Sequence, residues 1–120
     1  MARTWDAEEE TLLAEMWQTV AESQIHHEEH FWNVVTEMFN EHWNGPNRNK
    51  NQLTAKWRRM NSECQRFHAI HASLQPTPEP WGRAENAGNV FKERNGGKPF
   101  KYFHVWMILR SNNAWIRAMG

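Results

Sequence analysis

Apolar residues recur at intervals of three and four in three separate stretches of this chain. That spacing is typical of the buried face of an α-helix, and no stretch shows the two-residue alternation of a half-buried strand. The pattern therefore predicts an all-α protein. The three stripes are Leu12, Leu13, Met16, Trp17 and Val20; then Phe31, Trp32, Val35, Met38 and Phe39; then Leu53, Trp57, Met60, Cys64, Phe67 and Ile70 or His71.

Start and stop signals surround each stripe. Asp6 and Glu9 have the spacing of a capping box, which predicts a first helix at about 7–21. A second helix is expected at roughly 27–42, before the turn-rich residues 44–47. Asn49 or Asn51 can cap a long third helix, and the proline-rich residues 75–80 cannot continue it because proline lacks a backbone donor.

The chain length suits one domain with one core. Residues 1–74 are expected to form a three-helix unit, 75–82 a proline-rich linker, and 83–120 a helical C-terminal extension packed on the same core. In the extension, Ala84 to Phe91 predict a short helix that Gly96 and Gly97 end, and a last helix is expected from Phe103 to Trp115.

Charge is strongly segregated along the chain, although the net charge is zero. Residues 1–47 hold ten acidic residues and one basic residue, Arg3, whereas residues 48–120 hold thirteen basic and four acidic residues. This asymmetry predicts that one side of the fold faces a polyanion. The densest basic stretch contains Arg48, Lys50, Lys56, Arg58, Arg59 and Arg66.

Four segments carry a resemblance to a known family. Residues 5–10, Trp-Asp-Ala-Glu-Glu-Glu, look like the opening of the first Myb helix, and residues 31–35, Phe-Trp-Asn-Val-Val, like that of the second. Residues 48–57, from Arg48 to Trp57, match the third-helix signature. A final segment from Lys98-Pro99-Phe100 to Trp115 completes the order. The chain resembles the plant Myb/SANT-like domains of the trihelix type and the Myb-like partner proteins of Harbinger-type transposons.

The resemblance implies a three-helix, helix-turn-helix bundle whose third helix enters the major groove of double-stranded DNA. It also implies a nuclear protein, either a transcription regulator or a transposon-derived one, with base-contacting positions at Asn51, Ala55, Arg58 and Arg59. Arginine can bond guanine, asparagine or glutamine can bond adenine, and flanking basic side chains bind phosphate. The candidate DNA-binding residues are Arg48, Lys50, Asn51, Gln52, Thr54, Ala55, Lys56, Arg58, Arg59, Ser62 and Arg66.

Two other kinds of partner stay open. SANT domains resemble Myb repeats but bind histone tails or partner proteins, and the acidic N-terminal half could serve that function. The C-terminal extension could also bind a partner protein or a second copy of the chain through aromatic residues expected at its surface. These are Phe100, Tyr102, Phe103 and Trp106.

Enzymatic function is not expected. Residues 26–30, His-His-Glu-Glu-His, contain the H-x-x-E-H spelling of an inverted zinc protease, but catalysis needs a third protein ligand and a cleft. An exposed helix start is the favoured interpretation, with adventitious metal binding by His26 and His30 left open and no cofactor expected. Cys64 is expected to be a small buried hydrophobe. One cysteine and no long apolar run predict an intracellular protein without membrane contact.

Overall fold

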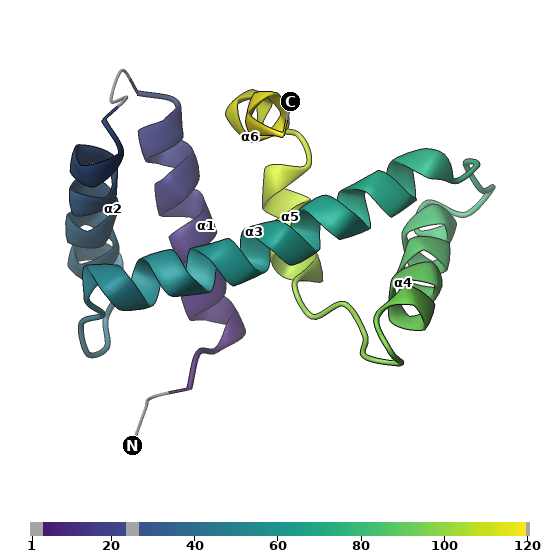
Figure 1. Ribbon diagram of the computed structural model, residues 1–120, viewed down its shortest axis with the longest axis horizontal. Helices are drawn as coiled ribbons and strands as arrows, with labels where there is room; N and C mark the ends of the chain where they lie inside the picture. Colours follow the sequence, from purple (N-terminus) through teal and green to yellow (C-terminus); the bar gives the residue numbers. More distant parts are fainter. Residues whose placement is uncertain (1–3, 24–26, 120) are drawn as a thin grey trace.

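The computed structural model describes residues 4–23 and 27–119, and the regular secondary structure of these residues consists of α-helices joined by loops (Figure 1). The prediction of an all-α protein is confirmed. The helices of the described residues are α1 (Ala7–Ala21), α2 (Glu28–His42), α3 (Lys50–Ser73), α4 (Gly82–Arg94), α5 (Phe103–Leu109) and α6 (Asn113–Ala118).

Side-chain caps begin the helices that matter most for the fold. The Asp6 carboxylate accepts a hydrogen bond from the Glu9 amide at 2.8 Å. The negative charges of three glutamates in the first turn interact favourably with the positive end of the α1 dipole. Asn49 caps α3 in a reciprocal capping box with Gln52. The predicted starts of α1 and α3 are therefore confirmed. The carboxylate of Glu9, expected to complete a capping box, instead binds Arg48 in the interior.

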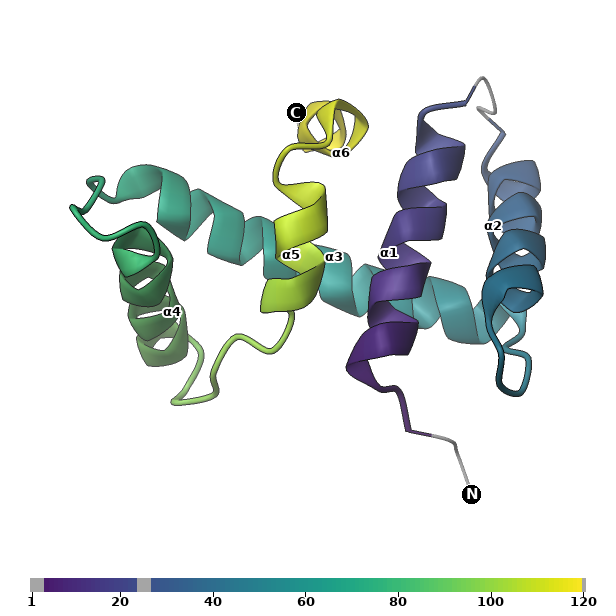
Figure 2. The ribbon, with the colours of Figure 1, turned by 180° about the vertical axis from the view of Figure 1, so that it is seen from behind.

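The helices are arranged around α3. α1 and α2 lie side by side as an antiparallel pair, and α3 crosses both of them (Figures 1 and 2). α4 packs on the C-terminal half of α3, and α5 contacts both α1 and α3. As a result α3 has one face against the other helices along its whole length and the opposite face toward solvent.

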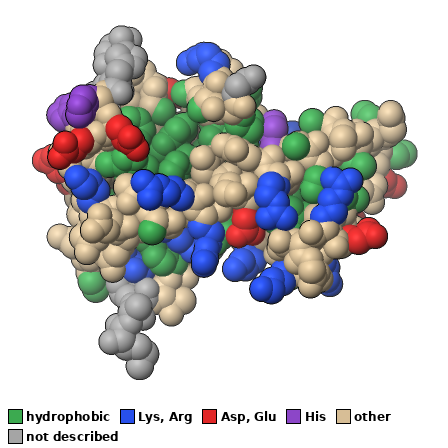
Figure 3. Space-filling model, viewed as in Figure 1, with side chains coloured by type: hydrophobic (Ala, Val, Ile, Leu, Met, Phe, Trp, Pro, Cys, Tyr) green, Lys and Arg blue, Asp and Glu red, His purple; other side chains and the backbone are tan. Residues whose placement is uncertain are grey.

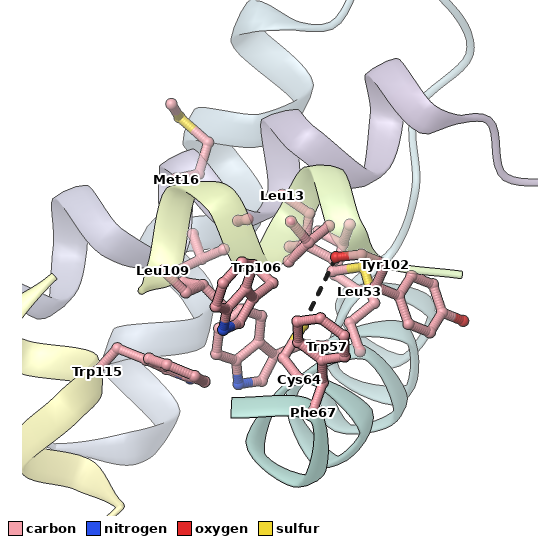
Figure 4. Close-up of a cluster of buried hydrophobic side chains, with 14 of the residues drawn as sticks. Leu13, Met16, Leu53, Trp57, Cys64, Phe67, Tyr102, Trp106, Leu109 and Trp115 are labelled. Atoms are coloured by element: carbon pink, nitrogen blue, oxygen red, sulfur yellow. Dashed lines mark hydrogen bonds between the residues drawn. The ribbon is translucent and has the colours of Figure 1, made fainter. Parts of the chain in front are cut away.

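A single cluster of buried side chains joins residues 1–74 to residues 83–120 (Figure 4). Phe67 of α3 stacks on Phe100 with ring centroids 4.2 Å apart and meets the edge of Trp106 at 4.8 Å. Near the other end of α3, Trp57 stacks on Trp17 of α1 at 4.5 Å. The predicted α3 stripe is buried in full: Leu53, Trp57, Met60, Cys64, Phe67 and Ile70.

The C-terminal helices differ from the prediction in one respect. The expected last helix is divided into α5 and α6, because the Asn112 side chain caps a new helix by accepting from the Trp115 amide at 2.8 Å. The Asn112 amide also donates to the Glu22 carboxylate at 2.8 Å, which fixes the break against the end of α1. This contact joins residues ninety positions apart, so local sequence patterns could not predict it.

Candidate nucleic-acid interface

The outward face of α3 carries a row of exposed polar side chains. With 3.6 residues per turn, positions 51, 55, 58 and 62 lie in one line along the helix, opposite the buried stripe. Arg59 and Arg66 lie roughly 60–80° to one side of that line, and Lys50 and Thr54 lie to the other side. Asn51, Gln52, Ala55, Arg58, Arg59, Ser62 and Arg66 are exposed, and Lys50 and Thr54 are half-buried.

Arg58 and Arg59 are free to meet a ligand. Neither side chain has a hydrogen bond or ion pair with another described residue, and basic side chains gather over α3 in the space-filling view (Figure 3). The neighbouring Lys50 ammonium donates to the Asn33 side chain at 3.3 Å, and the Thr54 hydroxyl donates to the Lys50 carbonyl at 3.0 Å. The two arginines are therefore the strongest donors that this face offers to solvent.

Arg48 lies in the interior, so its prediction as a DNA contact is wrong. The side chain is 3% exposed, and its Nε and Nη2 atoms donate to the two carboxylate oxygens of Glu9 at 2.8 and 3.0 Å. The guanidinium carbon also lies 4.1 Å from the centre of the Trp5 ring. Arg48 links the start of α3 to α1, because a buried guanidinium needs a carboxylate partner.

Lys56 is also used inside the fold. Its ammonium pairs with the Glu10 carboxylate at 2.7 Å, lies 5.1 Å from the centre of the Tyr102 ring, and is 14% exposed. His104 contacts the other Glu10 oxygen at 2.8 Å. The predicted contact of Lys56 with DNA stays a prediction, and the charge of Lys56 already has the Glu10 carboxylate as a partner inside the fold.

One edge of the α3 face carries acidic and basic side chains together. A hollow of about 480 Å³ lies between the start of α2 and the first turns of α3, and its lining includes two carboxylates, Glu28 and Glu29, and two cations, Lys50 and Arg58. Figure 3 shows acidic and histidine side chains together at this end of α2. The two carboxylates offset the two cations, so this edge offers a polyanion no net attraction.

The opposite edge of the α3 face is basic. A hollow of about 470 Å³ lies between the second half of α3 and the segment joining α4 to α5, and we call it the basic groove. Sequence reasoning missed Lys98 and Lys101 in this groove. The sequence does show one lysine on each side of Phe100, but it does not show that this segment folds back on α3. The lining residues are Arg59, Glu63, Arg66, Asn95, Lys98, Pro99 and Lys101.

The aromatic residues of the C-terminal extension are mostly inside. Tyr102 is buried and Phe100 is half-buried, so the prediction that these two lie at the surface is wrong; Trp106 is fully buried in the core. They are buried because they fill the space between α3, α4 and α5. Phe103 is 39% exposed and lies near the exposed Trp81, which leaves a small apolar patch on this side of the molecule.

His26 lies outside the described residues, and within these no three His, Cys, Asp or Glu side chains gather around a possible metal site. Cys64 is fully buried, and burial, with a smaller effect of Glu63, raises the pKa of its thiol far above the usual range. The reactive thiolate form is therefore disfavoured.

Comparison of the chain with known protein families, curated proteins and solved structures finds no match. None of the helices in residues 4–23 and 27–119 combines the length and apolar character needed to span a bilayer.

Proposed function

We propose that this protein binds double-stranded DNA through the exposed face of α3, as a transcription-factor-like or transposon-derived regulator in the nucleus. The observation that carries the proposal is the pair Arg58 and Arg59, exposed and without partners in the described structure, on a helix whose other face is buried; Arg58 is in line with Asn51 and Arg59 lies to one side of that line. A helix of this kind fits the major groove, which is about 12 Å wide.

Each exposed side chain has a role that its chemistry permits. Arg58 and Arg59 can each donate two hydrogen bonds to guanine, and Asn51 can bond adenine through its amide. Lys50, at the edge, carries a point charge suited to phosphate. In this proposal α1, α2 and α3 form the three-helix Myb/SANT-like unit, with α3 in the place of the recognition helix.

The test is duplex binding by the full chain at several salt concentrations. Arg58→Ala should weaken binding and reduce discrimination between sequences by about 1–3 kcal/mol, because a base-reading arginine is lost. Arg117→Ala removes the same charge from an exposed site on α6 and serves as the matched control. Equal binding by the parent, Arg58→Ala and Arg117→Ala would contradict the groove-reading role of α3.

A protein partner is the second candidate function, and exposed carboxylates on α1 and α2 favour it. Glu15, Glu37 and Glu41 are exposed. Glu9 and Glu10 form ion pairs inside the fold, so the surface of α1 and α2 is less acidic than the sequence suggests. A lysine-rich histone-tail peptide is the discriminating probe. If the chain fails to bind duplex but binds this peptide, and Glu37→Lys abolishes that binding, the SANT-like function replaces the DNA-binding one.

A further inference from the structure

The basic groove carries charge beyond that of the proposed reading face. It is lined by Arg66 of α3 and by Lys98 and Lys101 of the segment after α4, in addition to Arg59 of the reading face, against one carboxylate, Glu63. Arg66 donates to the Asn95 side chain at 3.2 Å and lies 4.9 Å from the centre of the Phe91 ring. The lysines have no carboxylate partner within the described residues, so the groove keeps a net positive charge.

The segment that brings these lysines to α3 is held in place from both ends. At its start, Gly96 and Gly97 adopt positive φ angles of 62° and 85°, and the Asn95 amide donates to the Lys98 carbonyl at 3.2 Å. At its end, Phe100 stacks on Phe67 in the core. Lys98 and Lys101 therefore flank an anchored residue, and little backbone entropy remains to be lost when a ligand binds.

We propose that the basic groove is a second DNA contact, which binds the phosphate backbone bordering the major groove that α3 enters. This inference rests on the proposed function. It specifies which side of α3 faces a DNA strand and which residues contact the phosphates of that strand. Arg66 lies eight residues beyond Arg58, roughly 12 Å along the helix and about 80° around it, on the side of the basic groove. With Arg58 over the bases, Arg66 and the two lysines reach the flanking strand.

The two edges of α3 differ in charge in this arrangement. On the α2 edge the charges of Glu28 and Glu29 are offset by those of Lys50 and Arg58, whereas the basic groove has an excess of positive charge. The duplex is therefore displaced toward the segment between α4 and α5. This placement gives the C-terminal extension a binding role in addition to its packing role, and it explains why Arg66, far along α3, is exposed toward the groove.

The experiment compares two double variants of the full chain that remove equal charge. Lys98→Ala with Lys101→Ala should lower the slope of log affinity against log salt by about two, because each phosphate contact contributes about 0.9. Lys92→Ala with Arg94→Ala, at exposed sites on α4 outside the groove, should leave the slope nearly unchanged. Glu63→Gln should increase affinity for all duplexes alike. Thermal melting of each variant checks that the fold is intact.

The outcomes separate this inference from the function on which it rests. Equal slopes for the two double variants, with Arg58→Ala still weakening binding, overturn the groove contact and leave the reading face standing. A reduced slope for the lysine pair, with no effect of Arg58→Ala, supports the groove and overturns the reading face. Absence of any salt-dependent duplex binding by the parent overturns both.

Discussion

The buried ion pair between Arg48 and Glu9 gives the sharpest test of how this fold is held together. Arg48→Ala removes the Nε and Nη2 donors from the Glu9 carboxylate, whose side chain is 1% exposed, and leaves that charge in the core without its guanidinium partner. Breaking one partner of such a pair costs about 3–5 kcal/mol, because the remaining charge is poorly solvated. The total stability of a domain is only about 5–15 kcal/mol, so a large part of the variant's stability is lost.

The assay is urea unfolding followed by tryptophan fluorescence, with thermal melting as a second measure. From an unfolding entropy of about 2.1 cal/mol/K per residue, a loss of 3–5 kcal/mol lowers the midpoint temperature by roughly 12–20 °C. Arg58→Ala is the matched control, because the same side chain is removed from an exposed site, and it should change stability by less than about 0.5 kcal/mol.

Replacing both partners by apolar residues of similar size sharpens the test. Glu9→Leu with Arg48→Met should recover most of the stability lost in Arg48→Ala, since no unpaired charge remains in the interior. If Arg48→Ala costs less than about 1 kcal/mol and instead weakens duplex binding as Arg58→Ala does, the internal role of Arg48 is refuted. The original expectation of a DNA contact would then be restored.

Two further predictions concern pH and backbone strain. Burial, then nearby Arg110, lowers the pKa of His68 below its usual 6.5, and its Nδ1 accepts from the Trp106 indole at 3.0 Å, so the neutral ring is the stable form. The contribution of neutral His68 to stability is therefore complete above pH 6.5 and is lost as the pH falls below that value. Between pH 7.5 and 5 the urea midpoint of His68→Gln should fall less than that of the parent, and an identical fall would contradict this. Gly97→Ala should cost about 1–2 kcal/mol by thermal melting, because a left-handed φ of 85° strains any L side chain although a Cβ would meet nothing within 4 Å. Gly88→Ala, equally unobstructed within helical α4, should leave stability unchanged or raise it by up to about 1 kcal/mol, and equal losses at both positions would rule out the φ argument.

Prediction from sequence worked best where the deciding interactions are local. The capping of α1 by Asp6 and of α3 by Asn49 depends on residues within three positions, and the buried stripe of α3 follows from helical spacing alone. The exposure of Arg58 and Arg59 follows from the same spacing, because they lie away from Leu53 and Trp57. This part of the candidate site was therefore predictable.

Prediction failed where a charge has a partner far along the chain. Arg48 and Lys56 look like their exposed neighbours in sequence, yet they pair with Glu9 and Glu10 of α1. Tyr102 looked available at the surface, but it is 2% exposed and lies beside Lys56 of α3. Composition and spacing carry no information about which of several like charges finds a buried partner.

The sequence by itself determined that this chain is helical, where its first helices begin, which face of each is apolar and that its charge is divided between two halves. Only the tertiary structure decided how that charge is used. Packing α1 against α3 withdraws Arg48 and Lys56 from the surface, and packing Phe100 on Phe67 brings Lys98 and Lys101 beside Arg66. The physical reason is range: helix spacing and caps act over one turn, whereas burial and ion pairing depend on neighbours that only folding brings together.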